Sequence, residues 1–123
     1  RVRRWGYLDD VEFARRWVDN RIQHRPRGER LLKQELRAKG VDADTIADVI
    51  EDAGIDEIAA ATTFARKAAE RMTNLDPAVA RRRLSGQLAR RGYGWDAIGP
   101  ALATADEFWA GADEADPDDF DSP

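Results

Sequence analysis

Basic side chains at regular spacing are the residues of this sequence that could do chemistry, and that chemistry is the binding of anions. Arg30, Lys33 and Arg37 are spaced i, i+3 and i+7, so on a helix they share one face. Leu32 and Leu36 fall on the opposite face of the same helix. The pattern predicts a helix that packs on one side and offers cations to a partner on the other.

A second basic cluster is expected in a later helix. Asp76-Pro77 is a strong helix-start signal, a capping residue followed by proline, and Arg81–Arg83 come soon after it. The positive end of the helix dipole opposes arginines near a helix start, so a partner that carries negative charge would offset that cost. Arg90 and Arg91 follow at the end of the same helix.

The net charge of −4 conceals alternating blocks of opposite sign. Residues 1–40 hold 12 basic and 6 acidic residues, and residues 65–92 hold 8 basic and 2 acidic residues. Residues 41–64 and 93–123 hold 7 and 9 acidic residues and no basic ones. The basic faces therefore have an alternative interpretation, as solvated surfaces whose arginines pair with the acidic block at 41–64. Such exposed pairs contribute only about 0–1 kcal/mol.

No pattern typical of catalysis or of a cofactor site occurs. The sequence has no cysteine and a single histidine, His24, and it lacks a glycine-rich phosphate loop and a nucleophile–base pattern. We therefore expect no enzyme activity, no cofactor and no metal. It also has no apolar run of about 20 residues, so we expect no membrane association and a cytoplasmic protein.

The elements that carry these residues are expected to be helices arranged as a tandem repeat. Phe-Ala-Arg at residues 13–15 recurs at 64–66, and Gly40 recurs as Gly92 at a shift of 52. At the same shift, Leu32 and Leu36 recur as leucines in the second half of the chain, at positions 84 and 88. The sequence predicts an all-α fold of tandem three-helix repeats, similar to helix-turn-helix units, that form an elongated, curved array whose handedness is left open.

The aromatic residues are interpreted mainly as packing groups. Phe13 and Trp17 are predicted to be core residues of the first helix. Tyr93 and Trp95 lie beside arginines in a linker, where they are predicted to pack over it. The alternative for these two is stacking on the bases of a nucleic acid.

The matched segments resemble the RecX family of bacterial regulators of the RecA recombinase. In the first repeat the resemblance lies in "GYLDDVEFARRWVDNR", "RPRG" and "LLKQELRAKGV". In the second it lies in "FARKAAERM" and "LSGQLARRGYGWDAI", so it covers about residues 5–105. Members of the family usually have three three-helix repeats, so the resemblance implies a fragment that holds the second and third.

This resemblance implies a regulator rather than an enzyme. Proteins of the family bind the RecA filament and restrain its strand exchange, ATP hydrolysis and co-protease activity, and DNA binding is also reported. The partners it implies are the RecA filament and single- or double-stranded DNA, bound by a monomer without a cofactor. We take as candidate RecA- or DNA-binding residues the basic side chains Arg25, Arg27, Arg30, Lys33, Arg37, Lys39, Arg81, Arg82, Arg83, Arg90 and Arg91.

The expected organisation has four parts. Residues 1–8 would end an upstream repeat, 9–54 and 55–105 would each form a three-helix repeat, and 106–123 would be an acidic, disordered tail. Asp9 or Asp10 is expected to cap the first helix of the first repeat. Two other functions remain open, namely a helical DNA-binding module that uses the basic faces and a helical scaffold without a nucleic-acid role.

Overall fold

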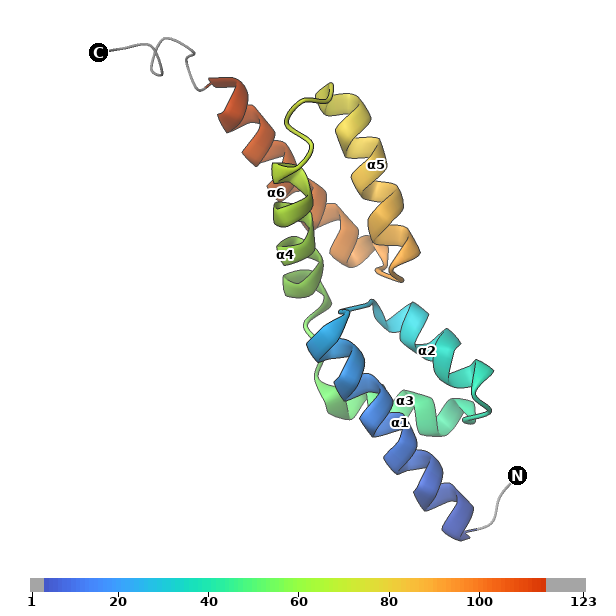
Figure 1. Ribbon diagram of the computed structural model, residues 1–123. Helices are drawn as coiled ribbons and strands as arrows, with labels where there is room; N and C mark the ends of the chain where they lie inside the picture. The colour runs from blue at the N-terminus through green and yellow to red at the C-terminus, as the bar shows by residue number, and fades with distance from the viewer. Residues whose placement is uncertain (1–3, 115–123) are drawn as a thin grey trace.

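The computed structural model describes residues 4–114 and contains six helices and no strand in that range (Figure 1). The chain order is α1 (Arg4–His24), α2 (Glu29–Ala38), α3 (Ala43–Ala53), α4 (Glu57–Glu70), α5 (Pro77–Arg90) and α6 (Trp95–Glu114). The first three helices lie at one end of an elongated molecule and the last three at the other. The prediction of an all-α tandem array is therefore confirmed.

The first repeat encloses its own apolar core between α1, α2 and α3. Val18, Leu32, Leu36 and Ile50 are among its buried residues. The Asp42 side chain caps α3 by accepting a hydrogen bond from Thr45 N at 2.9 Å. That bond lowers the pKa of the Asp42 carboxyl, so the cap is in place above the carboxyl's normal pKa and is lost as the pH falls through the lowered one.

The second repeat encloses a separate core between α4, α5 and α6. Leu84 and Leu88 from α5 and Leu102 from α6 are fully buried there against alanines of α4. Small residues on α4 let α6 approach it closely along their length, which Figure 1 shows. The matched leucines of the two repeats thus occupy equivalent core positions, as the repeat predicted.

The first helix begins earlier than expected. α1 starts at Arg4 and continues through Asp9 and Asp10, so neither aspartate is an N-cap. The interval contains no proline, and a glycine such as Gly6 costs a helix only about 1 kcal/mol. Residues 4–8 therefore belong to the same helix as the first residues of the first repeat.

The last helix continues further than expected. α6 runs to Glu114, and Trp109 is buried with its Nε1 donating to the carbonyl oxygen of Ala69 at 3.1 Å. The prediction of a disordered tail from residue 106 is therefore wrong for residues 106–114. The acidic composition of this segment led to the prediction of disorder. An apolar stripe, Ala105 and Trp109, nevertheless packs on α4. The remainder of the predicted tail, residues 115–123, lies outside the described residues.

The predictions for the aromatic residues are correct for some residues and wrong for others. Tyr93 is buried, and burial raises the pKa of its hydroxyl, whereas Trp95 is 71% exposed, so the packing prediction is wrong for that residue. Phe13 is 40% exposed and lies against the half-buried Trp17, with ring centroids 5.8 Å apart. Neither is a fully buried core residue.

Within residues 4–114, none of the helices has both the length and the apolar character needed to cross a membrane.

Candidate anion-binding site at the repeat junction

The two repeats meet where the N-terminus of α2 faces the C-terminus of α5. Gly28 N donates to the carbonyl oxygen of Arg91 at 2.8 Å. Two guanidinium groups complete the junction: Arg30 donates to the carbonyl oxygen of Ala89 at 3.3 Å, and Arg91 to that of Pro26 at 3.3 Å. The positive end of one helix dipole thus faces the negative end of another.

Two glycines allow this close approach. A Cβ on Gly28 would overlap the backbone of Gly92, and a Cβ on Gly92 would lie 2.6 Å from Leu31 N. Gly92 also has φ +90°, a conformation that disfavours residues with a side chain. Gly28 and Gly92, the second of which is the repeat counterpart of Gly40, are therefore contact points between the repeats.

Glu57, in the first turn of α4, ties the junction together. Its Oε2 accepts from Glu29 N at 2.9 Å, and its Oε1 lies 3.5 Å from Gly94 N. Gly28 occupies the N-cap position of α2 and has no side chain for capping, so Glu57 satisfies one free N–H at that helix start. A carboxylate there also suits the helix dipole.

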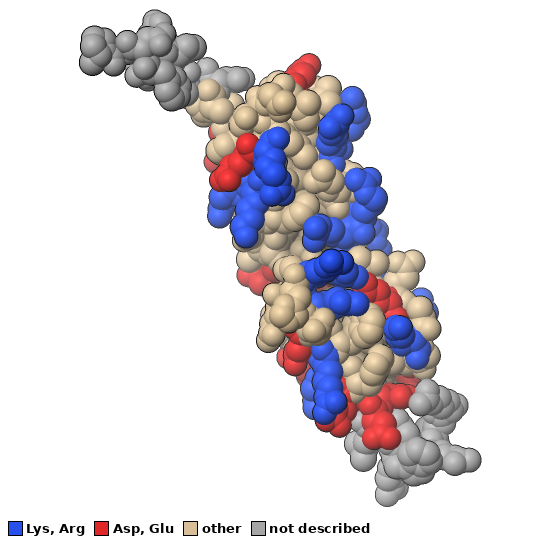
Figure 2. Space-filling view, in the orientation of Figure 1, with Lys and Arg blue, Asp and Glu red and all other residues tan. Residues whose placement is uncertain are grey.

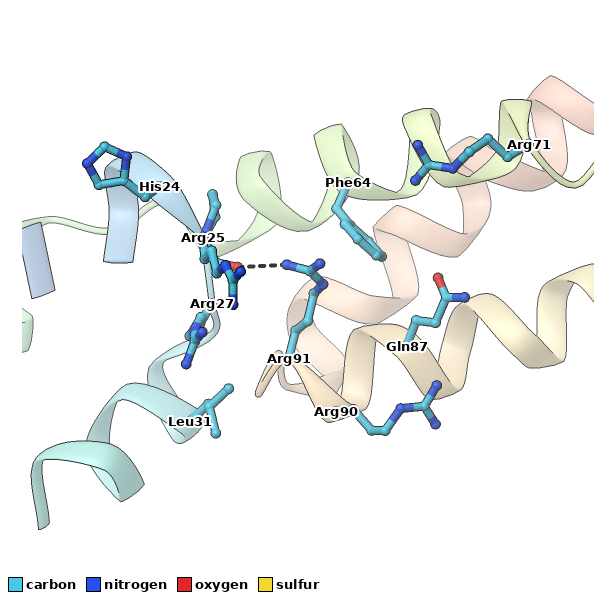
Figure 3. A pocket seen from close by; sticks show the side chains of 10 residues that line it. His24, Arg25, Arg27, Leu31, Phe64, Arg71, Gln87, Arg90 and Arg91 are labelled. Carbon is cyan, nitrogen blue, oxygen red and sulfur yellow. Dashed lines mark hydrogen bonds between the residues drawn. The ribbon is translucent and has the colours of Figure 1, made fainter. Parts of the chain in front are cut away.

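On one side of this junction lies an arginine-lined pocket of about 780 Å³. The first repeat contributes Arg25, Arg27 and Leu31, and Figure 3 shows the Arg91 side chain of the second repeat reaching toward the segment that carries Arg25 and Arg27. The lining residues from α4, α5 and the positions just after these two helices are Phe64, Arg71, Gln87, Arg90 and Arg91. We call this feature the junction pocket; His24 and Pro26 also line it.

The guanidinium groups of the junction pocket are only partly compensated. Arg27 forms an ion pair with Glu35, and Arg91 lies 4.2 Å from the centre of the Phe64 ring. Within the described part of the chain, the side chains Arg25, Arg71 and Arg90 make no ion pair or hydrogen bond. The pocket thus presents unpaired cations at a single place.

The like charges affect one another. Burial lowers the pKa of Arg27, and the positive charges of Arg21, Arg25 and Arg91 lower it further. An anion bound among these groups would remove part of that repulsion. The arrangement is therefore suited to hold a carboxylate or phosphate group, both of which guanidinium binds with two parallel hydrogen bonds.

Glu35 on α2 is the carboxylate that organises the neighbouring cations. It accepts from Trp17 Nε1 at 2.8 Å, pairs with Arg27, and lies 3.6 Å from Arg21 Nε. The Trp17 ring contacts two further cations: Arg21 Cζ lies 4.4 Å from the ring centroid, and Lys39 Nζ lies 5.2 Å from it. These contacts fix Arg27 and so position one wall of the junction pocket.

Replacing this carboxylate should destabilise the first repeat. We expect Glu35→Gln to lower the free energy of unfolding by about 1–3 kcal/mol, because it removes charged hydrogen bonds from half-buried partners. Glu12→Gln is the matched control, since the Glu12–Arg16 pair is exposed and should change stability by less than about 0.5 kcal/mol. Chemical denaturation of both variants measures the difference, and equal effects would contradict the role given to Glu35.

Other candidate residues lie elsewhere on the surface. Arg30 and Lys33 line a second hollow of about 770 Å³, together with carboxylates that include Glu57 and Asp96. Lys39 lies over the Trp17 ring as described above, and Arg37 is exposed. The side chains of α2 therefore do not all face the junction pocket.

The cluster near the start of α5 is exposed. Arg81 Nε lies 3.1 Å from Asp106 on α6, while Arg82 and Arg83 are exposed. No described carboxylate of residues 41–64 pairs with an arginine or lysine of the described chain. Direct ion pairs between that block and the basic faces are therefore absent among the described residues, although Asp56 and Glu57 line the second hollow beside Arg30 and Lys33. Figure 2 shows basic side chains over the second repeat and the junction, with a group of acidic ones at the far end of the first repeat.

Sequence reasoning did not find several lining residues of the junction pocket. Phe64 lies on α4 and Arg71 is the C-cap of that helix, seven positions later, so both fall on one side of it. Gln87 lies three positions before the predicted residue Arg90 on α5 and therefore shares its face. These spacings were the available signal, but only the junction shows that the two faces meet Arg25.

Comparison with known proteins gives two family matches along the chain. Residues 9–50 match the model of the second three-helix domain of RecX, and residues 55–102 match that of the third. The matches confirm the predicted resemblance and its assignment to the second and third repeats.

Similar proteins named "Regulatory protein RecX" occur in several bacteria. One from Mycobacterium avium (strain 104) is 41% identical over 90 residues, which is 72% of this chain and 52% of that protein. One from Thermobifida fusca (strain YX) is 39% identical over 89 residues, 72% of this chain and 48% of that protein. The chain thus spans about half the length of these relatives. No solved structure matches the chain at a significant level.

Proposed function

The chain belongs to the RecX family, and from that premise we propose that it binds the RecA filament and inhibits its ATPase, strand-exchange and co-protease activities. Through that inhibition it would modulate DNA repair and recombination. The observation that carries the proposal beyond the family match is the junction pocket, where unpaired arginines of both repeats meet.

The proposed contact surface consists of the basic side chains around and beyond the junction. Arg25, Arg27, Arg90 and Arg91 form its centre because they line one pocket. The remaining members would extend the contact along α2 and α5 and are Arg30, Lys33, Arg37, Lys39, Arg81, Arg82 and Arg83. Complementary charge on a partner speeds association and selects against other partners.

In this proposal the protein acts by occupying a surface and not by catalysis. It would work as a cytoplasmic monomer without a cofactor, with residues 9–54 and 55–105 as its two repeats. Binding of that kind slows the filament's turnover without any chemistry by the regulator.

The direct test is RecA ATP hydrolysis on single-stranded DNA with increasing amounts of this chain. We expect the ATPase rate to fall as the chain approaches a stoichiometric ratio to RecA. Full-length RecX from Mycobacterium tuberculosis (strain ATCC 25177 / H37Ra), which is 41% identical over 95 residues, serves as the positive control. If the full-length protein inhibits and an excess of this chain does not, these two repeats are not the inhibitory unit.

A second candidate function is a DNA-binding module that uses the same arginines. The unpaired guanidinium groups of Arg25, Arg71 and Arg90 favour it, since phosphates would also compensate them. This function predicts binding to DNA in the absence of RecA, with an affinity that falls steeply as salt increases. A titration of labelled single-stranded DNA at two salt concentrations separates it from filament binding.

A further inference from the structure

We propose that the junction pocket binds an acidic peptide segment of a partner protein, one that carries several carboxylates next to an apolar side chain. The inference rests on the proposed function and deepens it, because it names the chemistry by which a protein partner would be held. Its experiment uses the isolated chain and a peptide, so its outcome is independent of RecA inhibition.

The charge of the junction pocket calls for more than one anionic group. Five arginines line it, and within residues 4–114 the one carboxylate that forms an ion pair with any of them is that of Glu35. Three of the five, Arg25, Arg71 and Arg90, have no partner among the described residues. Two or three carboxylates on one segment would compensate them, and each could accept two hydrogen bonds from a guanidinium group.

The aromatic residues near the pocket argue for a peptide and against single-stranded nucleic acid. Proteins that hold single strands stack bases on free aromatic faces. The aromatic ring that lines this pocket, Phe64, already carries the Arg91 guanidinium on its face at 4.2 Å. Trp17 is covered by Arg21 and Lys39, and the exposed Trp95 does not line the pocket. The pocket therefore offers a base less free aromatic surface than sites that hold single strands provide.

The rest of the lining suits a peptide. Leu31, Phe64 and Pro26 provide apolar wall, and Gln87 adds an amide that can donate to or accept from a peptide backbone. The pocket volume of about 780 Å³ falls within the range of well-formed ligand sites. Arginines beside the pocket already bind a carboxylate of this protein, because Arg27 and Arg21 both form ion pairs with Glu35.

The surrounding surface does not extend the pocket into a track for a phosphate backbone. On the other side of the junction, Arg30 and Lys33 share their hollow with Glu29, Asp56, Glu57 and Asp96. Those carboxylates would repel successive phosphates, whereas a short peptide confined to the junction pocket would not meet them. The observations therefore favour an acidic peptide over a nucleic acid.

The test is a binding titration with a fluorescein-labelled five-residue peptide, Glu-Asp-Leu-Asp-Glu, up to millimolar concentration. A neutral peptide, Gln-Asn-Leu-Asn-Gln, and a labelled five-nucleotide oligothymidine are the comparison ligands. We expect the acidic peptide to bind the native chain and the other two to bind at least about tenfold more weakly.

Two double variants test whether the acidic peptide binds in the junction pocket. Arg25→Glu combined with Arg90→Glu should weaken binding of the acidic peptide by about tenfold or more, because each change turns attraction into repulsion. Arg15→Glu combined with Arg66→Glu is the matched control, with the same change in net charge and one exposed position in each repeat outside the pocket. The control should stay within about twofold of the native chain, as expected for distant surface charges screened by salt.

Thermal unfolding followed by circular dichroism shows that each variant is folded, and the milder pair Arg25→Gln and Arg90→Gln replaces the charge reversal if it is not. Equal losses in the pocket variant and the control would show attraction by bulk charge and overturn the proposal. Absence of acidic-peptide binding would overturn it as well. Tighter binding of the oligothymidine, lost in the pocket variant alone, would assign the site to nucleic acid instead.

Discussion

Gly92→Ala is expected to separate the two repeats, whereas Gly40→Ala, at the equivalent position of the first repeat, is not. Both glycines follow a helix and have φ +90°, so alanine meets the same backbone strain of about 1–2 kcal/mol at each. Only the surroundings differ. A Cβ on Gly40 has no atom within 4 Å, while a Cβ on Gly92 would lie 2.6 Å from Leu31 N.

The consequence at Gly92 is a displacement of α2 from the end of α5. Leu31 N belongs to the backbone of α2, so it cannot rotate away as a side chain would. The overlap is relieved by moving the repeats apart, which breaks the Gly28 N to Arg91 hydrogen bond and opens the junction pocket. Each repeat keeps its own core and should remain folded.

Two measurements on the full chain check this expectation. Small-angle scattering should show a larger radius of gyration for Gly92→Ala and an unchanged one for Gly40→Ala. Thermal unfolding should show a single transition in the native chain that broadens or divides in Gly92→Ala. Gly28→Ala provides an independent variant, because Gly28 has φ −73° and its alanine meets the overlap without the strain. Identical scattering for all three variants would contradict a locked junction.

Leu36→Ala and Leu88→Ala should each lower the free energy of unfolding by about 2–5 kcal/mol. Both side chains are fully buried, Leu36 in the core of the first repeat and Leu88 in that of the second. Removing a buried leucine loses apolar burial and leaves a cavity that the surrounding helices fill only in part. The effects should be similar, because the two residues occupy matched positions.

The location of each loss can be resolved with tryptophan fluorescence. Trp17 reports on the first repeat and Trp109 on the second, so single-tryptophan versions with the other tryptophans replaced by Phe follow one repeat each. Where neighbouring repeats are coupled by their interface, each leucine variant should shift both transitions, and its own repeat more strongly. A cost below about 0.5 kcal/mol for either variant is a surface-like effect and would contradict the core assignment.

The predictions that failed rested on residue type alone. Trp95 was expected to pack with Tyr93 over the linker, but only Tyr93 turns into the core of the second repeat. Asp9 and Asp10 have the residue type of helix caps, yet α1 is already formed before them. Residue type gives a local preference, whereas the neighbouring helices decide whether that preference is used.

The sequence by itself determined the helical repeat, its core leucines and the cap at the start of α5. Leu32, Leu36 and their counterparts were found because helical periodicity brings residues three and four apart onto one face. Asp76 was identified as a cap because a short side-chain acceptor satisfies N–H groups within its own first turn. Each of these interactions depends on residues close in the chain.

Only the tertiary structure decided where the repeats meet and which arginines share a pocket. Arg25 and Arg90 are 65 positions apart, and no spacing rule relates residues on different repeats. Their meeting depends on the approach of α2 to the end of α5, which two glycines permit and Glu57 holds. The reason is physical: helical periodicity fixes the face of a residue within its own helix, whereas packing between repeats fixes which faces meet across the chain.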